Sequence, residues 1–244
     1  MTFGIIGYGR FGQLWANALS ALGEVHVYDR THISTKSSSI QFVTLPEAAA
    51  CDIVFIIVPI SEFESTCTEI KNLIRPDSIV IDCCSVKTYP ATIMQKTFSK
   101  QQPLIATHPL FGPDSVHKSG GMMNHKIVIC PLQVDTAQLD KILNLLHQLQ
   151  LNVLITTPED HDKQMANSQG LVHFIGRGLA ALNLEQQEIS TPDFQALINI
   201  NKMVVNDTWQ LFLDMHRYNP YTRQVREQFL QQLNIINNEV NRDH

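Results

Sequence analysis

Short apolar runs and helical apolar stripes alternate along the first part of the chain. The run at residues 3–6 leads into a glycine-rich turn, and the next apolar positions recur every three or four residues, as in a helix that buries one face. These positions are Phe11, Leu14, Trp15, Ala18, Leu19 and Leu22. A second apolar run at residues 25–28 ends in Asp29. The pattern predicts a strand, a helix and a second strand in succession.

Four further apolar runs contain few polar positions. They lie at residues 52–59, 78–82, 103–107 and 126–130. Strands of this kind are buried on both faces, as in a parallel sheet covered by helices. The first part of the chain, residues 1–155, is therefore predicted to be an α/β domain with a Rossmann-type, doubly wound parallel sheet.

The pattern changes near Thr157 and becomes helical to the end of the chain. Residues 157–160 read Thr-Pro-Glu-Asp, which combines a cap, a first-turn proline and acidic residues at a helix start. We expect long helices over residues 157–182 and 191–218 and a third from residue 219 onward. Residues 156–244 would form an all-helical domain, and its broad apolar surface predicts a homodimer.

The glycine-rich turn has the spacing of a dinucleotide site. Gly7 suits a tight turn, Gly9 lets the backbone approach a pyrophosphate, and Gly12 lets the helix pack on the strand. The helix N-terminus then offers unpaired N–H groups to the phosphates. Asp29, at the end of the second strand, is placed to bind ribose hydroxyls. The alternative is a glycine-rich turn that binds nothing.

The acid at position 29 favours NAD over NADP, because a carboxylate repels a 2′-phosphate. Arg30 and Thr31 follow directly and could accept that phosphate, so NADP stays open. The polar residues 31–39 are expected to form a loop beside the adenosine. The candidate cofactor-binding residues are Gly7, Gly9, Arg10, Phe11, Gly12, Asp29, Arg30, Thr31 and Pro59.

Composition narrows the possible partners. The 244-residue chain is 44% hydrophobic and 17% charged, which is typical of a protein with a buried core. Its net charge of −5 and the absence of a basic block argue against nucleic acid. No apolar run has membrane-spanning length, and residue 1 leads directly into a strand, leaving no room for a signal peptide. The five cysteines lack metal-site spacing, which predicts reduced thiols in the cytoplasm and no metal.

Polar side chains follow two of the predicted strands, where a doubly wound sheet binds its substrate. Ser85 follows one strand and His108 ends another. A histidine has a pKa near neutrality, which suits it to accept the proton of an alcohol while hydride leaves the same carbon. Ser85 could orient that imidazole or the substrate hydroxyl. The alternative is a histidine that only closes a turn.

The first predicted long helix carries three polar residues on one broad face. At 100° per residue, His161, Gln169 and His173 lie at about 0°, 80° and 120°. They suggest contacts with an anion or a carbonyl group, although a solvated helix face explains them equally. Lys202, Asp207 and Trp209 are further candidates on the next helix.

Several motifs together resemble the prephenate/arogenate dehydrogenase family of tyrosine biosynthesis, and the helical part looks most like the plant-type arogenate dehydrogenases. The resemblance covers nearly the whole chain. The motifs are Gly-x-Gly-x-x-Gly-Gln at 7–13, Ser-Val-Lys at 85–87, Thr-His-Pro-Leu-Phe-Gly-Pro at 107–113, Glu-Asp-His-Asp at 159–162, Gln-Gly-Leu-Val-His-Phe at 169–174 and Asn-Asp-Thr-Trp-Gln-Leu-Phe at 206–212.

The resemblance implies an NAD(P)-dependent oxidative decarboxylation of prephenate to 4-hydroxyphenylpyruvate, or of arogenate to tyrosine. It implies that His108 engages the ring hydroxyl, that Ser85 bonds to His108, and that a dimer forms on the helical domain. The candidate substrate-binding residues are Lys87, His161, Gln169, His173, Lys202 and Asp207, and the resemblance implies that role for His173. Many members carry an arginine near the position of Lys202, and a lysine lacks its bidentate fork.

Two other readings remain open at this point. One is a hydroxyacid dehydrogenase or imine reductase with the same two-domain layout, which would normally use a lysine on the helical domain. The other is a non-catalytic nucleotide sensor, which would need neither Ser85 nor His108. Because the chain ends at His244, we expect no chorismate mutase or ligand-sensing domain. Asp207 favours arogenate weakly, since a carboxylate would pair with its ammonium group.

Overall fold

The computed structural model describes residues 1–31 and 39–242, which form two compact units. The first unit is Met1–His161 and the second begins at Asp162. The expected loop at residues 31–39 lies outside the described residues apart from its two ends. The two units are described separately below.

The first unit contains an eight-stranded sheet with the strand order β3-β2-β1-β4-β5-β6-β7-β8. The strands are β1 (Thr2–Ile6), β2 (Glu24–Tyr28), β3 (Ile40–Phe42), β4 (Ile53–Ile56), β5 (Ile79–Asp82), β6 (Leu104–Pro109), β7 (Lys126–Gln133) and β8 (Asn152–Ile155). The first six strands in this order pair in parallel. The predicted Rossmann-type α/β sheet is confirmed.

One strand departs from the expected parallel arrangement. β7 runs antiparallel to β6, with His108 opposite Val128 and Ala106 opposite Cys130. Only the seven-residue helix α5 (Pro113–Ser119) lies between them, whereas a parallel neighbour would require a longer crossover. β8 then pairs in parallel with β7 after the longer helix α6 (Thr136–Gln148).

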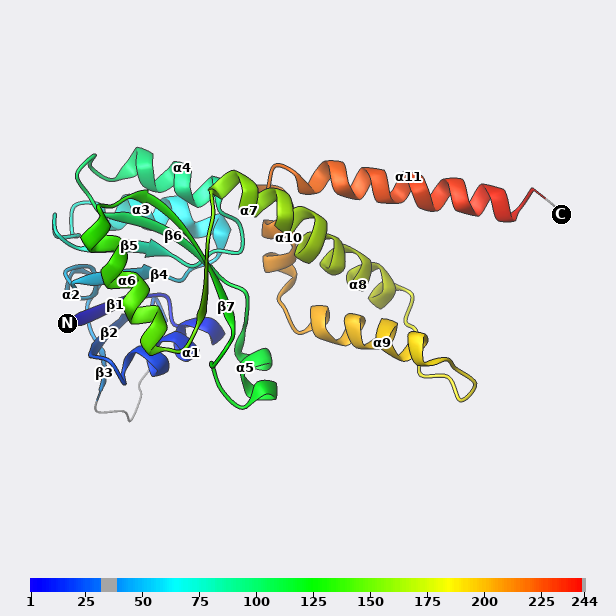
Figure 1. The fold of residues 1–244 in the computed structure, drawn as a ribbon, viewed down its shortest axis with the longest axis horizontal. Helices are drawn as coiled ribbons and strands as arrows, with labels where there is room; N and C mark the ends of the chain where they lie inside the picture. The colour runs from blue at the N-terminus through cyan, green and yellow to red at the C-terminus, as the bar shows by residue number, and fades with distance from the viewer. Residues whose placement is uncertain (32–38, 243–244) are drawn as a thin grey trace. The chain divides into compact units, whose positions relative to one another are not determined.

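Helices cover both faces of this sheet (Figure 1). On one face, α1 (Arg10–Leu19), α5 and α6 contribute Trp15, Val116 and Leu145 to a large apolar cluster with alternate strand residues. On the other face lie α2 (Leu45–Ala49), α3 (Phe63–Ile70) and α4 (Thr88–Thr97), with the short helix η1 (Ile60–Glu62) before α3. Side chains alternate along a strand, so His108 points to the same face as Ala106, which lies outside the large cluster.

The second unit is helical, as expected. Helix α7 (Pro158–Met165) begins in the first unit and continues through a π-helical turn (Ala166–Gly170) into α8 (Leu171–Ala181). The remaining helices are α9 (Pro192–Val205), α10 (Trp209–Tyr218) and α11 (Thr222–Val240). α8 packs on α9 so closely that a Cβ at Gly176 would lie 2.5 Å from Val204 Cγ2.

Two expectations about these helices are wrong. The single helix expected over residues 191–218 is broken after Val205, because Thr208 caps a new helix by accepting a hydrogen bond from Leu211 N at 3.1 Å. The helix expected over 157–182 is continuous, but the π turn interrupts its 100° spacing. The face calculated for His161, Gln169 and His173 therefore does not hold.

Among the described residues, none of the helices combines the length and the apolar character needed to cross a membrane.

Gly4 of β1 provides a test of how closely α2 packs on the sheet. A Cβ at this position would lie 2.0 Å from Ala48 O, which is backbone and cannot rotate away. We predict that Gly4→Ala lowers the free energy of unfolding by about 1–3 kcal/mol or more. The matched control is Gly178→Ala in α8, where nothing lies within 4 Å and up to ~1 kcal/mol of stabilisation is expected. Equal chemical-denaturation midpoints for the two variants would contradict the prediction.

Candidate active site

The turn between β1 and α1 requires glycine at two of its three glycine positions. Gly7 has φ +104°, and a Cβ there would lie 2.1 Å from Ile57 O. A Cβ at Gly12 would lie 2.3 Å from Gly7 O, so the helix could not pack on the turn. At Gly9, by contrast, nothing lies within 4 Å of an added Cβ.

The open space at Gly9 lies at the N-terminus of α1, where no side chain caps the helix. The first N–H groups of a helix have no partners within it and attract anions. The turn therefore fits the pyrophosphate of a dinucleotide, with Gly7, Gly9 and Gly12 as the cradle.

Asp29 follows β2 and is held by the backbone. Its Oδ2 accepts a hydrogen bond from Tyr8 N at 2.6 Å, and its Oδ1 accepts from Thr31 N at 2.8 Å and Thr31 Oγ1 at 2.5 Å. Burial raises the pKa of Asp29, but the hydrogen bonds from Thr31 and Tyr8 outweigh that effect and leave the pKa below its ordinary value. The carboxylate is therefore ionised and immobilised beside the glycine turn.

Arg30 is already paired with carboxylates. Its guanidinium lies 2.7 Å from Glu62 Oε2 and 3.6 Å from Glu69 Oε2. Thr31 donates its hydroxyl to Asp29, as described above. Arg30 and Thr31, the two residues that could bind a 2′-phosphate, thus both have anionic partners within the protein.

Three more candidate cofactor residues surround the turn. Arg10 begins α1 and lies 2.5 Å from Asp114 Oδ1 of α5. Phe11 stacks on Trp15, with ring centroids 5.7 Å apart, and packs in the apolar cluster. Pro59 follows β4 and precedes η1.

A buried ion pair joins the ends of β5 and β6. Asp82, the last residue of β5, and Lys87, just before α4, are both 0% exposed and form a salt bridge. Lys87 Nζ also donates to Thr107 O in β6. Asp82 accepts further hydrogen bonds from Cys84 N at 2.8 Å and Thr107 N at 3.2 Å.

This environment has two consequences for titration. Burial raises the pKa of Asp82, while Lys87 and the backbone donors oppose that rise. Burial likewise raises the pKa of Cys83 to about 12, so its thiol is protonated at neutral pH and is not a nucleophile. Lys87 is enclosed on all sides, a placement that fits a role in positioning the two strand ends better than contact with a substrate.

His108 pairs with His161. His108 Nδ1 lies 2.8 Å from His161 Nε2, and both rings are almost fully buried. Burial, followed by the neighbouring His161 and Lys87, lowers the pKa of His108 well below its ordinary value. His108 is therefore neutral at pH 7. Its Nε2 forms no hydrogen bond within the described residues and is the ring nitrogen left for a ligand.

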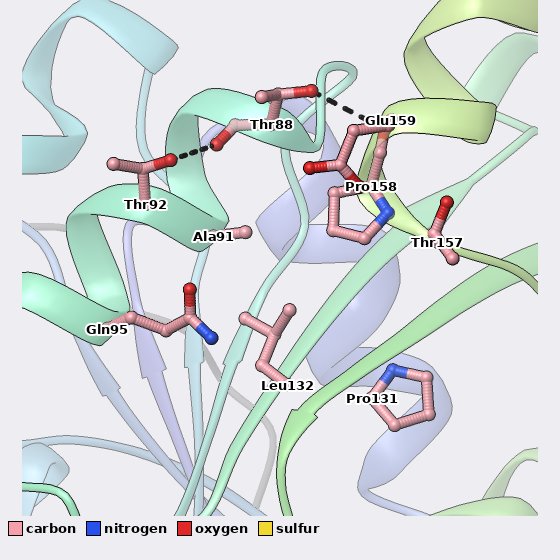
Figure 2. Close-up of a pocket in the computed structure, with 9 residues that line it drawn as sticks. All are labelled: Thr88, Ala91, Thr92, Gln95, Pro131, Leu132, Thr157, Pro158 and Glu159. Atoms are coloured by element: carbon pink, nitrogen blue, oxygen red, sulfur yellow. Dashed lines mark hydrogen bonds between the residues drawn. The ribbon is translucent and has the colours of Figure 1, made fainter.

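The start of α7 brings His161 to His108. Thr157 caps α7 by accepting from Asp160 N at 3.1 Å, and Thr88 Oγ1 donates to Pro158 O at 3.5 Å. Figure 2 shows Thr88, at the start of α4, bonded to this segment beside a surface cavity of about 290 Å³. Its lining residues are Thr88, Ala91, Thr92, Gln95, Pro131, Leu132, Thr157, Pro158 and Glu159. The cavity thus marks where the first residues of α7 lie next to α4.

Ser85 lies in the loop between Asp82 and Lys87 and is partly buried. No hydrogen bond joins it to His108 in the described structure, in which His161 holds the imidazole. The bond from Ser85 to His108 that the resemblance implies remains a prediction.

In the second unit, the candidate residues separate into a cluster and two outliers. His173 Nε2 lies 3.8 Å from Asp207 Oδ2, although the two are on α8 and on the turn after α9. Burial lowers the pKa of His173, Asp207 raises it and Arg177 lowers it further, so the ring is neutral. Gln169 lies half-buried in the π turn, and Lys202 is exposed on α9.

Sequence reasoning missed Arg177, which belongs to this cluster. Arg177 Nη2 donates to Asp207 O, and the guanidinium lies 5.5 Å from the centroid of the Trp209 ring. The one available signal was its spacing of four residues from His173, which places the two side chains on one helix face. Asp82 was also missed, because an acid at the end of a strand gives no sign of its buried partner.

No group of histidine, cysteine or acidic residues in the described part of the chain is arranged to hold a metal ion.

Comparison with known families identifies the nucleotide-binding fold. A family model described as "Prephenate dehydrogenase, nucleotide-binding domain" matches residues 24–155, more than half of the chain. The chain belongs to the prephenate dehydrogenase family. A second model, "TYRAAT1-like, C-terminal domain", matches residues 178–244.

Two curated relatives agree with this assignment. A "Probable arogenate/prephenate dehydrogenase" of Methanocaldococcus jannaschii is 28% identical over 194 residues, covering 76% of this chain and 43% of that protein. "Arogenate dehydrogenase 2, chloroplastic" of Arabidopsis thaliana is 26% identical over 230 residues, covering 90% of this chain and 64% of that protein. The chain thus spans less than two thirds of the length of either relative.

The fold is that of solved members of the family. A prephenate dehydrogenase from Aquifex aeolicus, solved with hydroxyphenyl propionate and NAD+, superposes with a TM-score of 0.75. The two proteins are 17% identical, and the match covers all of this chain and 91% of the other.

The buried ion pair is predicted to behave as a unit in unfolding. Lys87→Met should cost about 3–5 kcal/mol of unfolding free energy, because it leaves the Asp82 carboxylate buried without its cation. The double variant Lys87→Met/Asp82→Asn removes both charges and should recover part of that loss. Denaturant titration of the two single variants and the double variant measures the coupling between them. Additive losses would show that the charges are not coupled.

Proposed function

We propose that this protein is an NAD-dependent dehydrogenase that oxidatively decarboxylates prephenate or arogenate. The observation that carries the proposal is His108, a buried and neutral histidine at the end of β6, whose Nε2 has no hydrogen-bond partner among the described residues. The dinucleotide turn in the same unit and the family assignment support it. The relatives named as arogenate or prephenate dehydrogenases support the substrate class.

In this proposal His108 acts as the general base. For Nε2 to accept the proton of the ring hydroxyl, Nδ1 must carry hydrogen and donate to His161 Nε2, which fixes both tautomer and ring orientation. As the hydroxyl loses its proton, the C–H bond on the same carbon breaks and a C=O bond forms. The ring carboxylate then leaves as CO₂ and the ring becomes aromatic. A bound nicotinamide would supply the hydride acceptor.

Ser85 is proposed to orient the substrate hydroxyl. It lies in the loop held between Asp82 and Lys87, and its side chain forms no hydrogen bond with the described residues. Lys87 and His161 are then positioning residues, the first for the strand ends and the second for His108.

NAD is proposed as the preferred cofactor on the charges around position 30. Glu62 and Glu69 pair with the guanidinium of Arg30, and the carboxylate of the preceding residue, Asp29, is near enough for Arg30 to lower its pKa. A 2′-phosphate would have to displace at least one of these partners and would meet like charges. The diol of an NAD ribose carries no such charge and can donate to Asp29.

A homodimer is proposed through the helical unit. Large apolar side chains of α11 are exposed, among them Leu230, Leu233, Ile236 and Val240. Their spacing of three and four residues forms a stripe, which a second copy of the chain could cover.

The function is tested by crossing both substrates with both cofactors. We predict turnover of arogenate above that of prephenate, with NAD preferred over NADP. Asp29→Ser should raise the NADP-to-NAD ratio of kcat/KM by about tenfold or more, since it removes a repelling carboxylate worth on the order of 1.4 kcal/mol. The exposed Asp77→Ser serves as the control and should leave the ratio unchanged. A wild-type enzyme that strongly prefers NADP would refute the role of Asp29.

His108→Asn is predicted to keep NAD affinity, measured by fluorescence titration, and to lose about 10²–10⁴ in kcat. Ser85→Ala should lose less, because it does not take the proton. The pKa of His108 is lowered, so the wild-type base stays deprotonated on mild acidification. In the pH profile of kcat, the fall on the acid side should therefore lie below pH 6.5. His147→Asn, on the exposed face of α6, is the control. Near-normal turnover by His108→Asn would remove the proposed base.

A further inference from the structure

An acidic residue of α5 pairs with the first residue of α1, at the glycine turn. Asp114 Oδ1 lies 2.5 Å from Arg10 Nη2, and Arg10 directly follows Gly9 at the start of α1. The two partners are 104 positions apart in the chain, and both side chains are more than half exposed. An exposed ion pair of this kind adds little to stability. Its place beside an anion site therefore calls for another explanation.

Apolar packing fixes Asp114 relative to the turn. Phe111, just before α5, lies 6.1 Å from Phe11 and 6.4 Å from Trp15 of α1, measured between ring centroids. Val116 of α5 is buried in the same apolar cluster. The carboxylate is therefore carried by a helix that is anchored on α1, and it has a fixed place beside the turn.

Asp114 has a favourable environment even without Arg10. It lies in the first turn of α5, after Gly112 at the N-cap and Pro113. A carboxylate at this position is stabilised by the unpaired N–H groups and the dipole of its own helix. Water reaches it as well, because its side chain is 57% exposed. Moving the guanidinium of Arg10 to another partner thus costs Asp114 little.

Arg10 is placed to bind the pyrophosphate of a dinucleotide. Its backbone N–H is one of the first in α1, and these are the groups that phosphates meet at a glycine turn. A phosphate at that N–H lies within reach of the long, flexible side chain of the same residue. A guanidinium matches phosphate oxygens, to which it can donate two parallel hydrogen bonds. The phosphates and Asp114 are therefore rival partners for one side chain.

We propose that Asp114 competes with the cofactor pyrophosphate for Arg10 and so limits the affinity of the dinucleotide turn. This inference rests on the proposed function, because it requires a dinucleotide at this turn. The direct repulsion between Asp114 and the phosphates is screened by water and salt, so the effect passes mainly through Arg10. NAD and NADH share the pyrophosphate, so both are held less tightly. The reduced cofactor then leaves sooner after turnover, a step that limits the rate of many enzymes.

The test is a double-mutant cycle on cofactor binding, measured without substrate by NADH fluorescence titration of the full-length protein. Asp114→Asn should tighten NADH binding about 2- to 5-fold, since an exposed ion pair no longer has to be broken. Arg10→Met should weaken it about tenfold or more, because a charge-assisted hydrogen bond to phosphate is lost. In the Arg10→Met background, Asp114→Asn should have no effect beyond about 1.5-fold.

Two further measurements locate the effect on the pyrophosphate and on release. ADP-ribose, which keeps the pyrophosphate and lacks the nicotinamide, should give the same cycle when it displaces NADH. The dissociation rate constant of NADH, measured by stopped flow, should be lower for Asp114→Asn than for the wild type. The gain in affinity should shrink as ionic strength rises.

Control variants separate this role from a structural one. Asp193 has the matching place in α9, in the first turn after a proline, and is exposed. Asp193→Asn should therefore leave NADH binding unchanged. Asp114→Glu keeps the charge and should bind NADH as the wild type does. Arg223→Met removes an exposed arginine of α11 and should also have no effect.

Three results would overturn the proposal. If Asp114→Asn weakens NADH binding, Asp114 positions Arg10 for the phosphates and does not compete with them. If it tightens binding equally with and without Arg10, direct repulsion explains the whole effect. If it changes nothing, the ion pair has no influence on the cofactor.

Binding is read without turnover, so the two proposals fail in different ways. If the cycle behaves as expected but the wild type oxidises neither arogenate nor prephenate, the proposed reaction falls and the role of Asp114 stands. If the wild type oxidises either substrate but Arg10 and Asp114 show no coupling, the role of Asp114 falls alone. If NADH does not bind the wild type, the dinucleotide site is refuted and both fall.

Discussion

The first unit depends on two opposite charges that are completely removed from water. Removing an ion from water costs several kcal/mol, and attraction offsets that cost only where the geometry and the remaining hydrogen bonds are good. Asp82 and Lys87 meet this condition, because Cys84 N, Thr107 N and Thr107 O satisfy the atoms left over. Those partners belong to the ends of β5 and β6. The ion pair therefore sets the distance between the loop of Ser85 and the strand of His108.

The same dry environment determines the character of His108. Burial lowers the pKa of His108 most, and the neighbouring His161 and Lys87 lower it further, so the imidazole stays neutral. A neutral ring can accept a proton only while the reaction makes the donor strongly acidic. The loss of hydride from the same carbon has that effect, because the oxygen is then becoming a carbonyl. The enclosed Asp82–Lys87 ion pair and the weak basicity of His108 thus have the same cause, which is the exclusion of water from this face of the sheet.

The elements and their order could be predicted because they follow from local patterns. Apolar runs, the glycine turn and the cap at Thr157 each act within a few residues. The direction of β7 could not be predicted, since an apolar run is the same in either direction. The break after Val205 depends on the cap at Thr208, and a threonine alone does not mark a helix start, since Thr66 and Thr68 lie inside α3.

The sequence positions of the candidate site residues could be predicted, but the contacts between these residues could not. Ser85 and His108 could be placed at strand ends, because the edge of a parallel sheet is where such residues gather. The partner of His108 is 53 residues away and depends on where α7 starts. The contacts of Arg177 likewise depend on Asp207 and Trp209, which the turn between α9 and α10 places next to it. Pairings of this kind arise from tertiary structure alone.

Helix α11 carries a thermodynamic consequence. From residue 230 to the end of the helix every position is exposed, so neighbouring helices give this segment no cover. A helical segment this short is marginal in water when nothing packs on it, and its order must come from what covers the apolar stripe. If another copy of the chain covers the stripe, the fraction of molecules in which this segment is helical depends on protein concentration. Dilution would then fray α11 well before the sheet unfolds, and apparent stability would rise with protein concentration.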